Sequence, residues 1–202
     1  MIAHFAAVSL LGLAACVNGN NEYLKSFARP GSVPSDFYAC HGYGCKYTTR
    51  VSLSDEEWRS VRAILEPASA DSRSERRRAA SAVARLEQLA GQRTGTYTHQ
   101  RREGSWVDPT QLDCIDEAIN TWTYLTMLDH DGLLKYHSVG ELAHGGTVMD
   151  FDVRNTATLV AKADGKPFAI DPTLVDEGEP PPVFPLSNWM ATWPPEIPDV
   201  DR

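Results

Sequence analysis

The chain has too little positive charge to favour a nucleic-acid-binding surface. Its 27 acidic residues outnumber its 19 Lys and Arg residues, which gives a formal net charge of −8 at pH 7. Because phosphate binding needs clustered Lys and Arg, we expect no nucleic-acid partner. One basic run, RSERRR at residues 73–78, includes Ser74 and Glu75 and is typical of a solvated helix face.

The chain also lacks an apolar run long enough to span a bilayer, which takes about 20 residues. Residues 1–15 (MIAHFAAVSLLGLAA) contain no Lys, Arg, Asp or Glu, and Cys16 follows them. Such a short apolar segment is typical of a signal peptide, although its start has none of the usual Lys or Arg. The alternative is an N-terminal core helix, which the sequence NGNN at residues 18–21 would break.

The end of this apolar segment, Leu13-Ala14-Ala15-Cys16, resembles a bacterial lipobox. The resemblance implies cleavage before Cys16, lipidation of its thiol and a lipid anchor to the membrane. We therefore expect a lipoprotein signal peptide at residues 1–16 and a linker at residues 17–36. The expected location is the bacterial cell envelope, at the outer membrane or the periplasmic face.

Cysteine is scarce, with 4 in 202 residues, and each needs a role if the chain enters an oxidising compartment. Cys40 and Cys45 enclose the sequence His-Gly-Tyr-Gly, whose glycines permit a tight loop, so we expect a disulfide between them. His41 beside them could suggest a metal site, but no fourth ligand is nearby, so we expect neither metal nor cofactor. Cys114 is then the leftover thiol, either buried in the core or used.

Three segments have the apolar spacing of amphipathic helices. Residues 54–65 start with a capping box, and residues 71–89 end before Gly91. The third helix starts at Cys114, with Asp113 as its N-cap. A helix N-terminus carries about half a positive charge, which favours thiolate over thiol.

Three further segments indicate β-strands. Residues 133–139 form the first, and residues 156–163 and 166–171 form a pair. The intervening Asp164-Gly165 is a hairpin turn sequence.

The segment at residues 179–202 is rich in proline but holds large apolar side chains, so we expect it to wrap around the domain. The fold class that we expect is α+β, with helices packed on a small antiparallel sheet over residues 37–178.

The sequence Asp113-Cys114-Ile115-Asp116-Glu117-Ala118 is followed by a strand, Asp164-Gly165, a second strand and Asp171-Pro172-Thr173. In this order the motifs resemble the transglutaminase-like superfamily of papain-type thiol folds, over about residues 111–173. The resemblance implies a transglutaminase-like (papain-type) core. In that core Cys114 would be the nucleophile, and Asp171 would orient a catalytic histidine.

The usual place of that histidine falls near Thr156, with Arg154 as the next position on the same strand face, and neither is an imidazole. Arg154 cannot replace a general base, because it does not accept a proton at physiological pH. Three explanations remain open. The fold persists without catalysis, or His144 or His137 serves as the base, or the register differs. We take His144, beside a flexible Gly-Gly pair, as the candidate base.

Two main functions follow, beside a third and weaker hypothesis of a purely structural lipoprotein whose match to the family is fortuitous. The favoured one is a non-catalytic envelope lipoprotein that uses this fold as a binding or accessory module for an envelope protein or peptide. The alternative is a thiol hydrolase or acyltransferase in which Cys114 attacks protein or peptide amides. A histidine within about 4 Å of the Cys114 sulfur that also reaches Asp171 would indicate the enzyme. Arg154 or Thr156 in that place would indicate the non-catalytic module.

Overall fold

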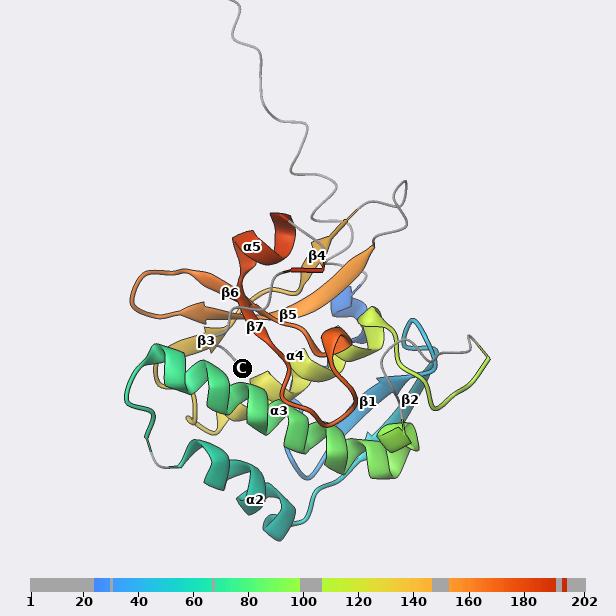
Figure 1. Ribbon diagram of the computed structural model, residues 1–202. Helices are drawn as coiled ribbons and strands as arrows, with labels where there is room; N and C mark the ends of the chain where they lie inside the picture. The colour runs from blue at the N-terminus through green and yellow to red at the C-terminus, as the bar shows by residue number, and fades with distance from the viewer. Residues whose placement is uncertain are drawn as a thin grey trace, which may run out of the picture.

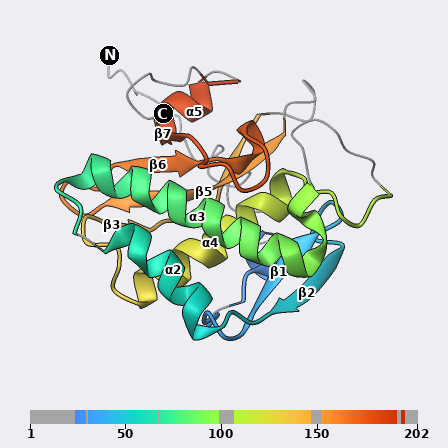
Figure 2. The ribbon, with the colours of Figure 1, turned by 60° about the horizontal axis from the view of Figure 1, so that its bottom comes forward.

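The computed structural model describes residues 24–29, 31–66, 68–98, 107–146, 153–191 and 194–195. Helix α3 (Ser72–Thr94) lies over helix α4 (Cys114–His130), and α4 lies against an antiparallel sheet (Figure 1 and Figure 2). This layered arrangement confirms the α+β class predicted from the sequence, with helices on small antiparallel sheets.

Helices α2, α3 and α4 each begin at a capping box. Helix α2 (Asp55–Leu65) follows Ser54, whose hydroxyl accepts from the Glu57 N–H while the Glu57 carboxylate accepts from the Ser54 N–H. Asp71 and Asp113 cap α3 and α4 in the same reciprocal way. These side chains satisfy N–H groups that a helix start leaves without intrahelical partners. The predicted starts of all three helices are therefore confirmed.

The end of α3 differs from the prediction. Gly91 lies inside the helix, which continues to Thr94 and ends at Gly95 with φ of 84°. A Cβ atom on Gly91 would lie 3.0 Å from the Tyr97 nitrogen and 3.1 Å from the Tyr97 Cα. Gly91 therefore permits the 3-10 turn η1 (Thr96–Thr98) to pack on the helix, and Gly95 supplies the left-handed C-cap.

The main sheet has the strand order β3-β5-β6-β7, and β4 also pairs with β5. Its neighbouring strands are antiparallel throughout the described pairs. The strands are β3 (His137–Val139), β4 (Ala143–Gly145), β5 (Arg154–Ala161), β6 (Pro167–Ile170) and β7 (Val183–Pro185).

One strand prediction is corrected, and the sheet contains a strand, β4, that the sequence does not predict. Residues 133–136 do not form a strand, because the N–H groups of Lys135 and Tyr136 donate to the Glu75 carboxylate of α3 instead of to a neighbouring strand. Strand β4 was not predicted, and Gly145 belongs to it rather than only to a turn. The predicted hairpin between β5 and β6 is present, with Gly165 at φ of 71°.

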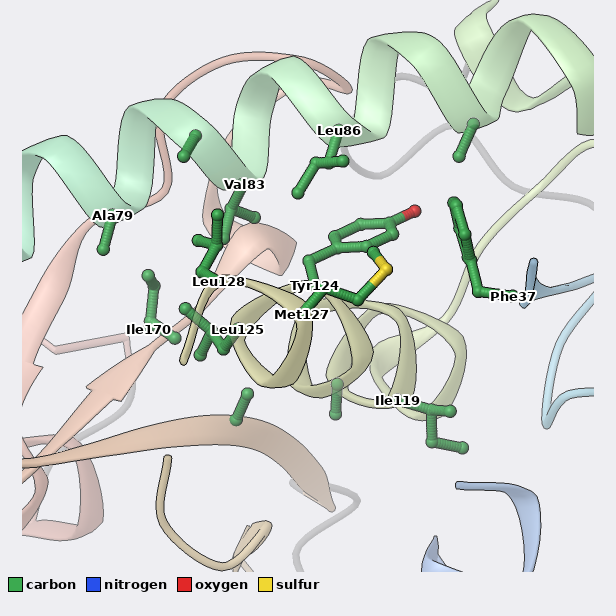
Figure 3. Packing of buried hydrophobic residues seen from close by; sticks show 14 of the residues in the cluster. Phe37, Ala79, Val83, Leu86, Ile119, Tyr124, Leu125, Met127, Leu128 and Ile170 are labelled. Carbon is green, nitrogen blue, oxygen red and sulfur yellow. The ribbon is translucent and has the colours of Figure 1, made fainter. Parts of the chain in front are cut away.

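The apolar core fills the space between α3, α4 and the sheet, as Figure 3 shows. Leu125 and Leu128 of α4 are fully buried, and each such side chain contributes roughly 1.5–3 kcal/mol through the hydrophobic effect. Because α4 is covered by α3 on one side and by strands on the other, it is fixed in place. The labelled partners from the other elements include Ala79, Val83 and Leu86 of α3 and Ile170 of β6.

A separate hairpin of β1 (Phe37–His41) and β2 (Tyr47–Val51) lies against α4. The predicted disulfide between Cys40 and Cys45 is confirmed within it. The Asn120 side chain of α4 accepts from the Cys40 N–H at 2.7 Å and donates to the Cys40 carbonyl at 2.9 Å. The hairpin is thereby joined to the helix that begins at Cys114.

The flanking segments are described in part. Leu24 and Phe27, within the predicted linker, pack on the core. After β7, helix α5 (Leu186–Ala191) follows, with Trp189 fully buried and Met190 exposed. Residues 1–16, including Cys16 and the predicted signal peptide, lie outside the described residues. Within the described part of the chain, no helix is long and apolar enough to cross a membrane.

Candidate thiol site

The candidate nucleophile lies at the first position of α4. One Asp113 carboxylate oxygen, Oδ1, accepts from the N–H groups of Ile115 and Asp116, each at 3.0 Å. Cys114 is half-buried, and its helix is buried along much of its length. The sequence prediction of a thiol at the start of a buried helix is confirmed.

The positive end of the helix is already occupied by carboxylates. The Asp116 side chain accepts from the N–H groups of Tyr43 at 2.8 Å and Cys45 at 2.7 Å. The Gly44 N–H donates to Asp113 Oδ2 at 2.9 Å. Tyr43 and Cys45 have positive φ angles of 68° and 54°, which turn these amides toward the acids. The helix dipole therefore acts on two carboxyl groups as well as on the thiol.

The thiol itself contacts an amide side chain. Asn155 Nδ2 donates to the Cys114 sulfur at 3.3 Å, and the sulfur lies 3.9 Å from the Val153 carbonyl oxygen. Burial, followed by the negative charge of Asp113, raises the pKa of Cys114 to about 11, although the hydrogen bonds from Asn155 act in the opposite direction. The group is therefore a neutral thiol at neutral pH.

The candidate base, His144, is connected to the Cys114 sulfur through one side chain, that of Asn155. Its Nδ1 lies 2.9 Å from Asn155 Oδ1, and the two residues face each other across the β4–β5 pair. Since the Asn155 carbonyl accepts only, Nδ1 carries the proton of this hydrogen bond. Asn155 thus stands between Cys114 and His144 and contacts both.

Among the described residues, the hydrogen-bond partners of the Cys114 sulfur do not include a histidine. His4 and His99 lie outside the described residues. The structure therefore brings together two of the three predicted catalytic residues, Cys114 and His144, with an amide between them.

The third candidate, Asp171, is fully buried and is engaged elsewhere. Its Oδ1 accepts from the Thr173 N–H at 3.1 Å and from the Thr173 hydroxyl at 2.6 Å. Its Oδ2 accepts from the Trp189 indole N–H at 2.6 Å. Burial raises the pKa of Asp171 even though these donors, and the Arg154 charge nearby, act to lower it. Both carboxylate oxygens of Asp171 thus already accept hydrogen bonds, from Thr173 and from Trp189.

Strand alternation explains why Asp171 does not reach the thiol. Ala157 of β5 pairs with Ile170 of β6, and both face the core cluster that contains α4. Asn155, two residues before Ala157, shares that face, whereas Asp171, one residue after Ile170, belongs to the opposite face. On that opposite face Ala169 packs with Trp189.

The two positions predicted for the family histidine are also accounted for. The Thr156 hydroxyl is buried and donates to the Ile170 carbonyl at 2.8 Å. Arg154 is buried, its guanidinium lies 5.0 Å from the centre of the Trp189 ring, and its Nη2 donates to the Trp189 carbonyl at 3.2 Å. Asn155, between these two residues, is the one that contacts Cys114, and the sequence prediction missed it. Counting back along a predicted hairpin pointed to the neighbours of Asn155, and a one-residue step changes the face.

The other histidine considered as a base, His137, is the first residue of β3 and lies beside the far end of β5. It pairs with Ala161, about 20 Å along the strand from Asn155 at roughly 3.3 Å per residue. His137 is fully buried, and its Nδ1 lies 2.9 Å from a Glu75 carboxylate oxygen. Its environment makes it part of the structural framework and not a partner of Cys114.

The ring of His41, weighed as a metal ligand beside the disulfide, has two protein partners. Its Nδ1 lies 2.6 Å from the Pro109 carbonyl oxygen and its Nε2 lies 2.9 Å from the Thr49 hydroxyl. Within the residues that the structure describes, no group of three or more His, Cys, Asp or Glu side chains has the arrangement of a metal site.

Comparison of the chain with family models, with curated proteins and with solved structures finds no match. Inferences about function therefore depend on the site itself. That site holds a protonated thiol at a helix start, an amide donor on the sulfur and an imidazole beyond the amide.

Proposed function

We propose that this chain is a lipid-anchored protein of the bacterial cell envelope whose transglutaminase-like core acts as a non-catalytic binding or accessory module. The expected ligand is an envelope protein or peptide. The observation that carries the non-catalytic part is the hydrogen bond from Asn155 to the Cys114 sulfur. An amide occupies the place where a thiol enzyme needs a base.

The order of elements supports a core of this kind. A helix that begins at the cysteine packs against β5, and the hairpin from β5 to β6 leads to Asp171. The same order of helix, strand, turn, strand and aspartate underlies the resemblance to the transglutaminase-like superfamily. The export and lipid anchor are proposed from the sequence of residues 1–16 alone.

The chemistry of the site supports the loss of catalysis. Acyl transfer begins with attack by a thiolate, and a neighbouring base must take the proton of the thiol. An Asn side chain cannot take that proton, because its amide is not basic at physiological pH. With burial and Asp113 raising the pKa of Cys114 to about 11, little thiolate exists at neutral pH. The carboxylate of Asp171 is held by Thr173 and Trp189.

One observation favours the alternative, a thiol hydrolase or acyltransferase on protein or peptide amides. His144 is joined to Cys114 through a single side chain, Asn155. A rearrangement that moved Asn155 aside would bring the imidazole toward the sulfur. The active form would then differ from the described one in the β4–β5 region.

The pH dependence of Cys114 alkylation by iodoacetamide separates the two functions. Mass spectrometry of the peptide that carries Cys114 reports this thiol alone, and Cys114→Ser is the blank. We expect labelling of the folded wild type to rise only near pH 11. A midpoint near pH 7 or below, abolished by His144→Ala, would establish an activated nucleophile and overturn the non-catalytic assignment.

The Asn155→His variant provides a matched positive control. It places an imidazole where the amide lies, so labelling is expected to begin at a lower pH than in the wild type. The Asn155→Ala variant removes the amide without adding a base and should not activate the thiol. If Asn155→Ala and Asn155→His label alike, the side chain at position 155 does not decide the reactivity of Cys114.

The envelope assignment has a separate test. Expression in a bacterial host followed by mass spectrometry of the mature N-terminus is expected to show diacylglycerol on Cys16. The Cys16→Ser variant should remain unlipidated and leave the membrane fraction. An unprocessed chain that begins at Met1 would contradict this part of the proposal.

A further inference from the structure

A cavity of about 480 Å³ opens at the end of the sheet away from the thiol. Its walls come from the first turns of α3, the segment at residues 135–136 and the β5–β6 hairpin. This volume lies within the range of small-molecule sites in proteins. Its lining includes Arg76, Lys135, Lys162, Asp164, Lys166 and Phe168, together with two alanines.

The charge of this cavity is opposite to that of the chain. Four cationic side chains line it, those of Arg76, Lys135, Lys162 and Lys166, against the single carboxylate of Asp164. The chain as a whole carries a formal charge of −8. Concentration of positive charge in one hollow of an acidic protein raises the local concentration of anions. We call this hollow the basic pocket.

Two of the cations are held in defined positions. The Arg76 guanidinium lies 3.9 Å from the centre of the Phe168 ring, and its Nη1 lies 3.3 Å from His137 Nε2. The Lys162 ammonium donates to the Leu134 carbonyl at 2.8 Å. The ring fixes the plane of the guanidinium, so its positive charge has a defined place in the pocket before a ligand arrives.

The acidic groups near the pocket are already engaged. Asp164 pairs with Lys166 at 2.8 Å. Behind the wall, the Glu75 carboxylate accepts from the N–H groups of Lys135, Tyr136 and His137 and contacts the His137 ring. These donors also hold the segment that carries Lys135. The pocket therefore keeps a net positive charge, and the segment at residues 135–136 in its wall is held in place by hydrogen bonds to Glu75.

We propose that the basic pocket binds a phosphoryl group carried on a small organic or lipid framework. A phosphate ester presents several oxygens around one centre and up to two negative charges, which suits a pocket lined by four cationic side chains. The guanidinium offers paired donors, and the ammonium groups add point charges. Phe168 and the alanines supply an apolar surface for the framework beyond the phosphate.

This proposal is independent of the thiol site. The pocket includes Ala161, whereas Cys114 contacts Asn155 at the opposite end of β5. It also gives a role to Arg76 of the basic run at residues 73–78, which the sequence alone interpreted as a solvated helix face. We therefore expect substitutions in one site to leave the other unchanged.

The test uses sn-glycerol 3-phosphate as a soluble probe and vesicles as a membrane probe. The folded chain is titrated with the probe at constant ionic strength, and amide shifts of pocket residues are followed by NMR. Sodium chloride of equal ionic strength is the blank. The membrane arm compares vesicles that contain phosphatidylglycerol with vesicles of phosphatidylcholine alone, using protein without its lipid anchor.

We expect saturable shifts at the pocket in the wild type. The Arg76→Gln variant should weaken binding about tenfold or more, because charged hydrogen bonds to the phosphate are lost. Lys135→Gln changes an exposed residue and tests the pocket without disturbing the Arg76 contact with Phe168. Lys46→Gln is the matched control, since Lys46 is an exposed cation beside an aromatic ring on the other sheet.

Each outcome is decisive. Binding of the soluble probe that Lys135→Gln weakens and Lys46→Gln leaves unchanged supports phosphoryl recognition from solution. Binding only to phosphatidylglycerol vesicles, with the same pattern among variants, supports recognition of a lipid headgroup. Shifts reproduced by sodium chloride, or affected equally by Lys46→Gln and Lys135→Gln, would overturn the proposal.

Discussion

Two buried carboxyl groups on the same helix, Glu75 and Glu87 of α3, have opposite environments. Glu75 near the start of the helix accepts from three consecutive backbone N–H groups and from the His137 ring. Glu87 accepts from the Gly178 N–H at 3.3 Å and faces the charges of Glu177 and Glu117. Both side chains are almost fully buried, with exposures of 1% and 6%.

Their pKa values move in opposite directions. Burial alone would raise the pKa of Glu75, but the hydrogen bonds from His137 and from the backbone N–H groups lower it. Burial, followed by the charges of Glu177 and Glu117, raises the pKa of Glu87 well above its usual value. Burial and the same neighbour Glu177 also raise the pKa of Glu117. At Glu75 the donors outweigh the effect of burial on the pKa, whereas at Glu87 burial and the neighbouring charges outweigh a single N–H donor.

Asp116 beside the thiol lies between these extremes. It accepts from three backbone N–H groups, those of Tyr43, Cys45 and Asp113. Burial and the charge of Asp113 nevertheless raise the pKa of Asp116 to about 7. Burial and one neighbouring carboxylate thus outweigh good donors at Asp116, and the same carboxylate also raises the pKa of Cys114.

Removal of the Glu75 carboxylate should have the largest effect. Glu75→Ala leaves three N–H groups and a buried imidazole without their acceptor, so the free energy of unfolding should fall by about 3 kcal/mol or more. Urea denaturation measures the change. Glu56→Ala, at an exposed position of the same residue type on α2, is the control and should change stability by less than about 0.5 kcal/mol. Equal losses in the two variants would contradict the role given to the N–H donors.

Neutralising Glu87 and Glu117 should raise the free energy of unfolding at neutral pH, the opposite of the effect of Glu75→Ala. An acid whose pKa is raised on folding stabilises fully below its unfolded pKa of about 4.3, and this contribution is lost as pH rises through the folded value. Each such group costs about 1.4 kcal/mol per pH unit in that window. The double variant Glu87→Gln, Glu117→Gln should therefore lose less stability than the wild type between pH 5 and 8, as measured by urea denaturation. A parallel pH dependence in both proteins would show that these acids ionise freely when folded.

A methyl group at Gly91 tests the packing of α3 against η1 and against Glu177, whose charge acts on Glu87 and Glu117. In Gly91→Ala the new Cβ would lie 3.0 Å from the Tyr97 nitrogen and 3.2 Å from Glu177 Oε1. We expect a net loss of about 1 kcal/mol, because the contact outweighs the gain of about 1 kcal/mol in helix propensity. Thermal denaturation measures it, with Ser81→Ala, on a surface turn of the same helix, as the control. Higher stability in Gly91→Ala would mean that η1 moves away at little cost.

The smallest effect is expected from Asp113→Asn. Asn remains a good N-cap, so the helix start is kept while one negative charge is removed. The pKa values of both Cys114 and Asp116 should fall, because the Asp113 charge raises each of them. Alkylation of Cys114 at a fixed pH should then be faster by at most about tenfold, the equivalent of one pH unit. Unchanged alkylation would assign the high thiol pKa to burial alone.

Features decided by nearby residues could be predicted from the sequence. Ser54 and Asp113 were identified as caps because their partners are three residues away. The Cys40–Cys45 disulfide followed from a short loop with glycines. The α+β class followed from the periodicity of the apolar residues. Each of these depends on local backbone geometry, which the chain encodes directly.

Features decided by distant contacts could not be predicted. Asn155 contacts Cys114 across 41 positions of the chain, and the face on which it lies depends on the register of β5. Residues 133–136 have the composition of a strand, but Glu75, 60 positions from Lys135, accepts from the N–H groups of Lys135 and Tyr136. The sequence predicts a helix end at Gly91, because the packing of η1 on this glycine is not visible in the sequence. In each case a tertiary contact overrides a local preference.

The disulfide loop has a consequence for how the protein matures. Cys40 and Cys45 are separated by only five positions, so their ring can close before distant segments meet. Oxidation of this pair removes the two thiols that lie near the start of α4 and that could exchange with Cys114. The same closed loop then presents the amides of Tyr43 and Cys45 to Asp116, and that of Gly44 to Asp113. We expect the oxidised loop to hold these three amides in place for the carboxylates at the start of α4.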